Sequence, residues 1–224
     1  MKEYTQTEDK SSLILDAVQK FAISPEDVQA IVSKHQAKYK EKNPTATHTE
    51  MQDTVARSIT KRYSTLCGTV GAVSSLPGII PGFGTVAAAV GGTSSDIIIC
   101  MKLEVDMCMC LAQNYDWDIT IEDAQYLSLL IAGGATLEKL GVKPGAKIAS
   151  KAGVKLLRKY LKGGALKVVK ELFKKIGIKF TRTALEKTIP FGIGVVFSAT
   201  ANYYITKYVG HSARKWFIND RDDK

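Results

Sequence analysis

Residues Leu76 to Gly92 read Leu-Pro-Gly-Ile-Ile-Pro-Gly-Phe-Gly-Thr-Val-Ala-Ala-Ala-Val-Gly-Gly and carry the most informative composition in the chain. This stretch lies within thirty-nine residues, 63–101, whose only charged side chain is Asp96. The stretch is too rich in small residues for an ordinary apolar span and too apolar for a solvated loop. Small residues let helix backbones approach closely, so the stretch predicts tight helical packing against protein or lipid.

A second uncharged region near the C-terminus repeats this pattern, with Ile189-Pro-Phe-Gly-Ile-Gly194 matching Ile80-Pro-Gly-Phe-Gly84. The sequence therefore predicts two helical hairpins broken by Pro and Gly. Their packing residues are predicted to be Pro77, Pro81, Gly82, Gly84, Pro190, Gly192, Gly194 and Asn202. Two interpretations stay open, a place in the core of the bundle or insertion into a bilayer. Neither run has the roughly 20 consecutive apolar residues of a spanning helix, so insertion would be conditional.

The opposite composition follows at 143–182, where thirteen Lys or Arg face one acid, Glu171. This segment carries a charge of +12 and the whole chain only +9, so the remainder sums to −3. Such a local patch predicts an anionic partner, and lysines near an anionic leaflet contribute about 1 kcal/mol each. The predicted lipid-binding residues are Lys147, Lys151, Lys155, Arg158, Lys159, Lys162, Lys167, Lys170 and Lys174.

The basic segment has two further interpretations besides lipid binding. One is a solvated face that keeps the domain soluble. The second is nucleic-acid binding, which is disfavoured because eleven of the thirteen basic residues are Lys and no nucleic-acid module is legible. Lys143, Lys147, Lys151, Lys155 and Lys159 advance by four, which predicts a helix with one basic side. The same helix would place Ile148, Ala152, Leu156 and Tyr160 on a neighbouring apolar face.

Helix signals occupy most of the remaining chain, and no stretch shows the alternation of a sheet. Ser24-Pro-Glu-Asp27 predicts a helix through about Glu41, Thr49 the start of a second, and Thr120-Ile-Glu-Asp123 the start of another. Gly163-Gly164 interrupts the basic helix, and the apolar face is predicted to resume with Leu166, Val169, Leu172, Phe173 and Ile176. The fold class is all-α, a helical bundle. The predicted division is a helical extension at 1–48, a helical domain at 49–219 and a polar tail at 220–224.

A long helix from Ser94 or Ser95 through Tyr115 is predicted to carry one apolar face and one polar face. The apolar face holds Ile97, Met101, Val105, Cys108 and Ala112, and the polar face holds Lys102 and Asp106. Asp96 has two interpretations. It caps this helix, where the dipole stabilises a carboxylate, or it lies in an apolar setting and acts as a pH-dependent switch.

Catalysis finds little support in the sequence. Cys67, Cys100, Cys108 and Cys110 have no framework spacing and predict buried thiols, and the three histidines lie in polar or terminal segments. The segment Gly82-Phe-Gly-Thr-Val-Ala87 has the letters of a dinucleotide fingerprint but lacks its βαβ context. No cofactor, metal or enzymatic activity is predicted. A hydrolase remains an alternative, because catalytic triads assemble from distant residues.

The order of these motifs resembles the bacterial EcsC family over roughly residues 50–217. The first half carries Leu76-Pro-Gly-Ile-Ile-Pro-Gly-Phe-Gly84, Asp96 and Ala112-Gln-Asn-Tyr115. The second half carries Ile189-Pro-Phe-Gly-Ile-Gly194, Ala201-Asn202-Tyr203, Ala213 and Phe217. One departure is Asp116, which stands where the family usually has Gly. The resemblance implies a helical protein associated with bacterial membranes or with transport or secretion systems, and it supplies no catalytic residues.

The function predicted from the sequence is a non-enzymatic protein that docks on an anionic membrane surface, with a transporter or secretion-system component as a further partner. The polar N-terminus shows no signal peptide, which predicts a cytoplasmic protein held peripherally at the membrane. Two alternatives stay open. One is a membrane-perturbing effector delivered into a target cell without a cleavable signal, and the second is a peptidase-like hydrolase associated with a transport system.

Overall fold

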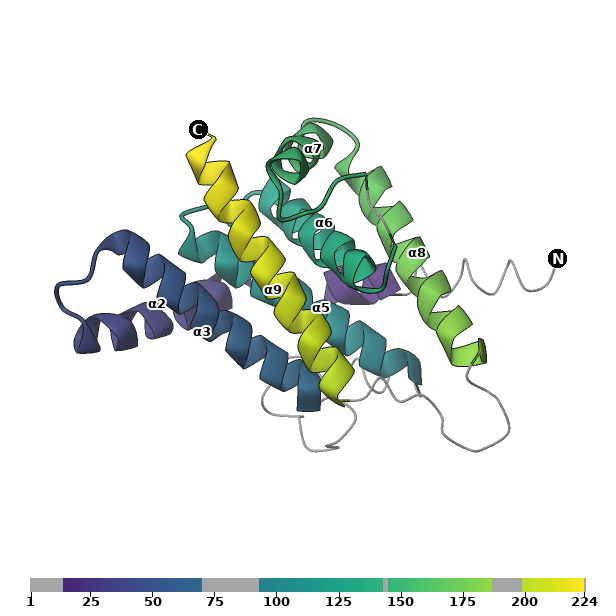
Figure 1. The fold of residues 1–224 in the computed structure, drawn as a ribbon, viewed down its shortest axis with the longest axis horizontal. Helices are drawn as coiled ribbons and strands as arrows, with labels where there is room; N and C mark the ends of the chain where they lie inside the picture. The colour runs from purple at the N-terminus through teal and green to yellow at the C-terminus, as the bar shows by residue number, and fades with distance from the viewer. Residues whose placement is uncertain (1–13, 70–92, 143–144, 187–198, 224) are drawn as a thin grey trace.

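The computed structural model describes residues 14–69, 93–142, 145–186 and 199–223, with 93–96, 179–186 and 199 described by their backbone only. These residues form helices and connecting turns and contain no strand, which confirms the all-α prediction (Figure 1). Residues 14–20 are helical. The longer helices are α2 (Pro25–Lys42), α3 (His48–Thr69), α5 (Thr93–Asn114), α6 (Glu122–Lys139), α7 (Lys151–Leu161), α8 (Ala165–Glu186) and α9 (Ala199–Asp222).

The helix α5 lies in the middle of the bundle, packed by α2, α3, α6 and α9, while α8 packs on α6. In Figure 1, α3 and α9 lie side by side. They run antiparallel, because Asp53 pairs with Arg214 and Thr60 faces Gly210. A Cβ at Gly210 would lie 2.4 Å from the Thr60 side chain and 3.0 Å from the sulfur of Met107. Glycine at this position therefore allows three helices to meet.

The predicted start of α2 is confirmed, because the Ser24 hydroxyl accepts a hydrogen bond of 3.2 Å from the Asp27 amide. The helix α3 begins before the predicted position. Thr47 accepts from the amide of Glu50, and the Glu50 carboxylate accepts from the amide of Thr47 at 2.9 Å. This reciprocal pair is a capping box, so Thr49 lies inside the helix that it was predicted to open.

The predicted cap of α6 is wrong. The helix starts at Glu122, with Ile121 at the capping position and no side-chain hydrogen bond there. The Thr120 hydroxyl donates instead to the carboxylate of Asp118, at 2.6 Å. Asp118, two residues before Thr120, competes with the helix for this hydroxyl. Short polar side chains commonly form local hydrogen bonds in this way.

The end of α5 places Asp116 in a backbone conformation that favours glycine. Asp116 has a φ of 62°, in the left-handed region that glycine adopts most readily, and Gly141 closes α6 with a φ of 80°. The amide of Trp117 donates back to the carbonyl of Ala112 at 3.0 Å, as a left-handed cap requires. The Asp116 carboxylate accepts a hydrogen bond of 2.8 Å from Gln52, which ties this turn to α3.

The hydrophobic core extends across the two predicted domain boundaries. Val28 and Val32 of α2 are buried in the same cluster as Trp216 and Phe217 of α9. Asp220 is also buried, although it begins the segment predicted to be a polar tail. The packing therefore continues from α2 through the end of α9.

Candidate functional site

The exposed lysines of α7 form the first part of the candidate site. The Ser150 hydroxyl caps the helix by accepting from the Gly153 amide at 3.0 Å. The helix buries Gly153, Val154 and Leu157, and this leaves the opposite side to solvent. That side carries the exposed residues Lys151, Lys155, Lys159 and Lys162.

Two details of the α7 prediction are wrong. Because the helix begins at Lys151, the exposed Lys147 lies in the turn before it, and Lys143 lies outside the described residues. The apolar face is also displaced, since Ile148 is buried ahead of the helix and Ala152 is exposed. The Ser150 cap sets this register, which spacing by four alone does not specify.

The helix α8 extends the basic surface. Its buried side holds Val169, Phe173 and Ile176, as predicted. Two apolar side chains of α8 are exposed, Leu166 at 41% beside the buried side and Ile178 at 42% among the outer lysines. Spacings of three, four and four place the following residues on one outward face: the exposed Lys167 and Lys170, the half-buried Lys174 and the exposed Ile178.

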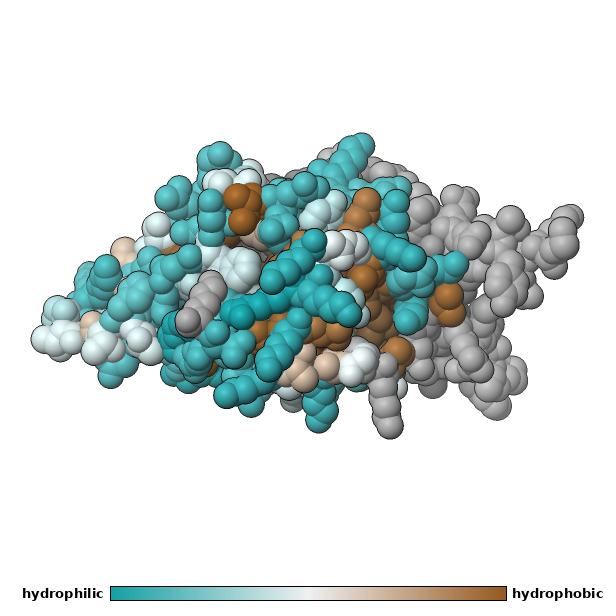
Figure 2. All heavy atoms as spheres, turned by 90° about the horizontal axis from the view of Figure 1, so that it is seen from above, coloured by the Kyte–Doolittle hydropathy of each residue, from teal (hydrophilic) through white to brown (hydrophobic). Residues whose placement is uncertain are grey.

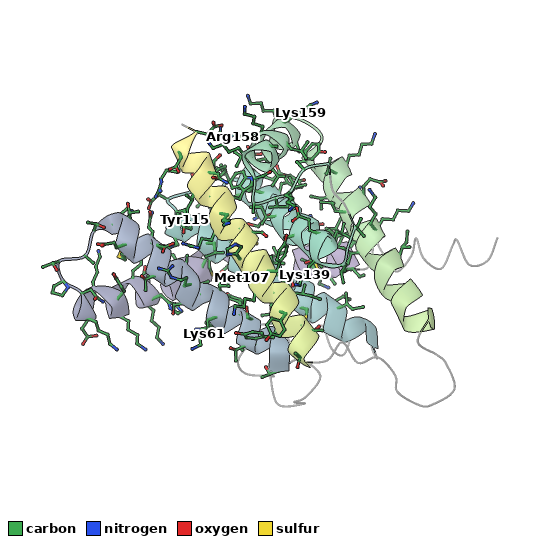
Figure 3. The ribbon with its side chains drawn as sticks, viewed as in Figure 1. Lys61, Met107, Tyr115, Lys139, Arg158 and Lys159 are labelled. Carbon is green, nitrogen blue, oxygen red and sulfur yellow. The ribbon has the colours of Figure 1, made fainter. Side chains whose placement is uncertain are left out.

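Arg158 differs from the lysines around it because its guanidinium binds within the protein. Its Nε donates to the Asp220 carboxylate at 2.7 Å, and a second nitrogen donates to the Asp220 carbonyl at 2.9 Å. A third contact reaches Asp223 at 3.2 Å. Figure 3 shows Arg158 and Lys159 on α7, near the C-terminal end of α9. Arg158 thus holds the basic helix on the bundle.

The basic α7 lies at the opposite end of the bundle from the start of α9. The Arg158 contact places α7 beside residue 220, whereas the second uncharged segment ends where α9 begins, at Ala199. Twenty-one residues of helix separate these points, which is about 30 Å at about 1.5 Å per residue. The end of α3 and the starts of α5 and α9 all lie at the lower end in Figure 1. Figure 2, seen from above, shows mostly hydrophilic side chains with hydrophobic ones between them.

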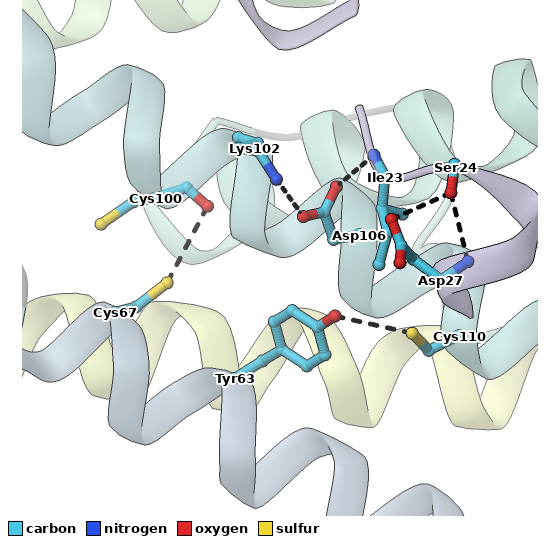
Figure 4. A network of polar contacts seen from close by, with 9 residues as sticks. All are labelled: Ile23, Ser24, Asp27, Tyr63, Cys67, Cys100, Lys102, Asp106 and Cys110. Carbon is cyan, nitrogen blue, oxygen red and sulfur yellow. Dashed lines mark hydrogen bonds and ion pairs between the residues drawn. The ribbon is translucent and has the colours of Figure 1, made fainter. Parts of the chain in front are cut away.

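The predicted polar face of α5 is wrong, because Lys102 and Asp106 are buried and form an ion pair with each other. Asp106 also accepts a hydrogen bond of 3.1 Å from the amide of Ile23 (Figure 4). Burial raises the pKa of the Asp106 carboxyl, and the Lys102 ammonium opposes that rise. The pair is buried because α2, α3, α6 and α9 pack around α5, and because the segment that ends at Ile23 lies against Asp106. The sequence pattern does not show that this N-terminal segment contacts α5.

Glu104 is a third buried charged residue on α5, and no prediction from the sequence included it. Its carboxyl accepts from the Thr136 hydroxyl of α6 at 2.7 Å and from the Thr206 hydroxyl of α9 at 3.1 Å. Burial raises its pKa to about 7, against the opposing effect of both hydroxyls. The sequence signal that could have found it is the presence of Lys102, Glu104 and Asp106 within one otherwise apolar helix.

The prediction of buried thiols is confirmed for Cys67, Cys108 and Cys110, whereas Cys100 is half-buried. None of the four forms a disulfide. Burial raises the pKa of Cys108 well above its usual range and that of Cys110 to about 12. These two thiols therefore stay protonated, and a protonated thiol is a poor nucleophile.

Several predicted site residues lie outside the described part of the chain: Pro77, Pro81, Gly82, Gly84, Pro190, Gly192 and Gly194. Asn202, on α9, is described and buried. Asp96 falls in the first turn of α5, where its backbone alone is described. Its two interpretations stay predictions.

Across the described residues, no helix combines the length and apolar character needed to cross a membrane. The same part of the chain holds no cluster of three or more His, Cys, Asp or Glu suited to a metal ion. No family model, curated protein or solved structure matches the chain.

Proposed function

We propose that the protein is a non-enzymatic membrane-associating protein that docks on anionic lipid through the exposed lysines of α7 and α8. The observation that carries the proposal is the outward side of α7, where four lysines share a surface opposite the buried residues. Lysines gathered in this way attract an anionic leaflet over a Debye length. The resemblance to the EcsC family supports the same class of function.

The outward face of α8 adds an apolar side chain to the basic surface. It places Lys167 and Lys170 on the same face as the exposed Ile178, so ammonium groups can meet headgroups while an apolar side chain enters the interface. Conditional insertion of the two uncharged segments stays a prediction from the sequence, because these segments lie outside the described residues.

Co-sedimentation with vesicles tests this proposal. The protein is expected to bind vesicles containing phosphatidylserine, to bind phosphatidylcholine vesicles far less, and to dissociate as NaCl rises from about 0.05 to about 0.5 M. Lys151→Glu, Lys155→Glu and Lys159→Glu together should remove most of the binding. Equal binding to the two vesicle types would refute electrostatic docking.

A matched control is available on α2, where Lys34, Lys38 and Lys42 are also exposed and also spaced by four. Reversing these three charges changes the net charge by the same amount at a different surface. Binding should survive this change. If the α2 variant lost as much binding as the α7 variant, attraction would depend on total charge and α7 would have no particular role.

A resident accessory protein and a membrane-perturbing effector would dock in the same way, and vesicle leakage separates them. An accessory protein is expected to bind without releasing a trapped dye. An effector is expected to release the dye at protein-to-lipid ratios where binding is saturated.

A further inference from the structure

Glu104 is the meeting point of three helices in the core. Each of its two carboxyl oxygens accepts one hydroxyl, Thr136 from α6 and Thr206 from α9. All three side chains are buried. The two donors lie 32 and 102 residues away along the chain, so this single side chain joins three separate parts of the fold.

The contrast with Asp106, two residues later on the same helix, shows what Glu104 lacks. Asp106 has an ammonium group beside it, from Lys102, and accepts the amide of Ile23. In the described part of the chain, burial raises the pKa of the Glu104 carboxyl, and the hydrogen bonds from its two hydroxyl donors lower it. A buried carboxylate without a cation is strongly disfavoured relative to the neutral acid.

The titratable groups around this joint belong to three helices. From α5 itself, the Cys108 thiol lies close enough for Glu104 to raise its pKa, after the larger effect of burial. From α6, Glu138 accepts a hydrogen bond of 2.7 Å from the Tyr208 hydroxyl of α9. Lys139 of α6 lies over the ring of Tyr208. None of these groups supplies a positive charge to Glu104.

Both protonation states can satisfy the hydrogen bonds of the joint, but only one is neutral. The ionised carboxylate accepts from both threonines. The protonated carboxyl donates to one of them, and that hydroxyl can turn to the carbonyl one turn earlier in its own helix, as threonine commonly does. Loss of the proton therefore leaves a buried negative charge, and the free-energy cost of burying that charge falls when water reaches it.

We infer that Glu104 is a proton-controlled joint, which holds α9 on α5 and α6 while protonated and loosens the N-terminal half of α9 when it ionises. α9 is the helix that yields, because Thr206 lies in its second turn and its chain continues directly from the uncharged segment at 187–198. This inference concerns the core of the bundle and does not depend on lipid binding. The raised pKa of Glu104, about 7, places the transition near neutral pH.

Hydrogen exchange of the full-length protein tests the joint. With intrinsic rates corrected, wild-type amides at 202–210 are expected to lose protection on the order of tenfold between about pH 5.5 and about pH 8, while α2 changes little. Glu104→Gln, which is neutral at both pH values, should show equal protection of α9 at both. The joint is refuted if wild-type α9 shows no change or if Glu104→Gln responds to pH as the wild type does.

Glu138→Gln is the matched control, because it neutralises another acid at the contact of α6 with α9. It should keep the wild-type response, and a loss of that response would assign the pH dependence to Glu138 instead.

A second measurement needs no variant. Carbon-13 NMR of the side-chain carboxyls should show a glutamate that titrates near pH 7 in the folded protein. Titration of every glutamate below about pH 5 would overturn the inference even if Glu104→Gln failed to fold.

Discussion

Charged side chains on α5 and on α7 follow the same spacing but have opposite environments. Lys102 and Asp106 lie four residues apart in the core and pair with each other. Lys151 and Lys155 are also four apart, and both face solvent. Removing the partner of a buried charge destabilises the fold. Exposed lysines contribute little to stability and remain available to a ligand. Changes to single charges should therefore affect folding in α5 and binding in α7.

The largest effect on stability is expected from Lys102→Met. The substitution leaves Asp106 buried without its cation, and breaking such a pair typically costs about 3–5 kcal/mol. The loss should be smaller at acidic pH, where protonation of Asp106 removes the unpaired charge. Urea unfolding at about pH 7 and about pH 5 measures both values.

A double variant controls for the change in packing. Lys102→Met with Asp106→Asn removes both charges and keeps an acceptor for the amide of Ile23. It should recover part of the lost stability. A loss below about 1 kcal/mol in the single variant would mean that the ion pair is less important than its burial implies.

Glu104 should make the free energy of unfolding fall as pH rises. Its folded pKa, about 7, is above its ordinary value of 4.5, so the folded state holds the proton more tightly than the unfolded state. Stability from this group is complete below about pH 4.5 and is lost by about pH 7, a change of roughly 3 kcal/mol. Glu104→Gln should flatten this part of the profile. An unchanged slope in the variant would contradict the assignment.

An intermediate effect is expected from Arg158→Ala, because Asp220 is buried and would lose its guanidinium partner. Asp220 would lose two hydrogen bonds from the guanidinium, and a hydrogen bond to a charged group typically contributes about 1.5–3 kcal/mol. Lys159→Ala, the neighbouring and exposed residue, is the control and should change stability by less than about 0.5 kcal/mol. Thermal unfolding compares the two. Equal effects would remove the distinction between the anchoring arginine and the outward lysines.

The smallest effect on stability is expected from the α7 variant that should abolish lipid binding. Lys151→Glu, Lys155→Glu and Lys159→Glu together should change the free energy of unfolding by no more than about 0.5 kcal/mol per site, since all three side chains are exposed. Urea unfolding and circular dichroism measure this. A loss of several kcal/mol would show that these lysines support the fold, and reduced vesicle binding would then have a structural cause.

The sequence by itself determined the helical class, the Ser24 cap and the apolar positions of the helices that face the core. These features depend on residues within one or two helical turns, so local spacing is enough to reveal them. Met101, Val105 and Cys108 were found in this way, and so was the run of lysines on α7. The prediction of the α6 cap was wrong because Asp118, which binds the Thr120 hydroxyl, lies two residues before the capping pattern Thr120-Ile-Glu-Asp123.

Only the tertiary structure decided what the charges on α5 and α7 do. The partners of Glu104 and Arg158 lie up to 102 residues away, and helical periodicity contains no information about contacts at that separation. Periodicity assigned Lys102 and Asp106 to a polar face, but the surrounding helices cover that face and turn the two residues into a buried pair. The placement of the basic helix about 30 Å from the start of α9 likewise follows from the contact of Arg158 with Asp220 near the opposite end of α9.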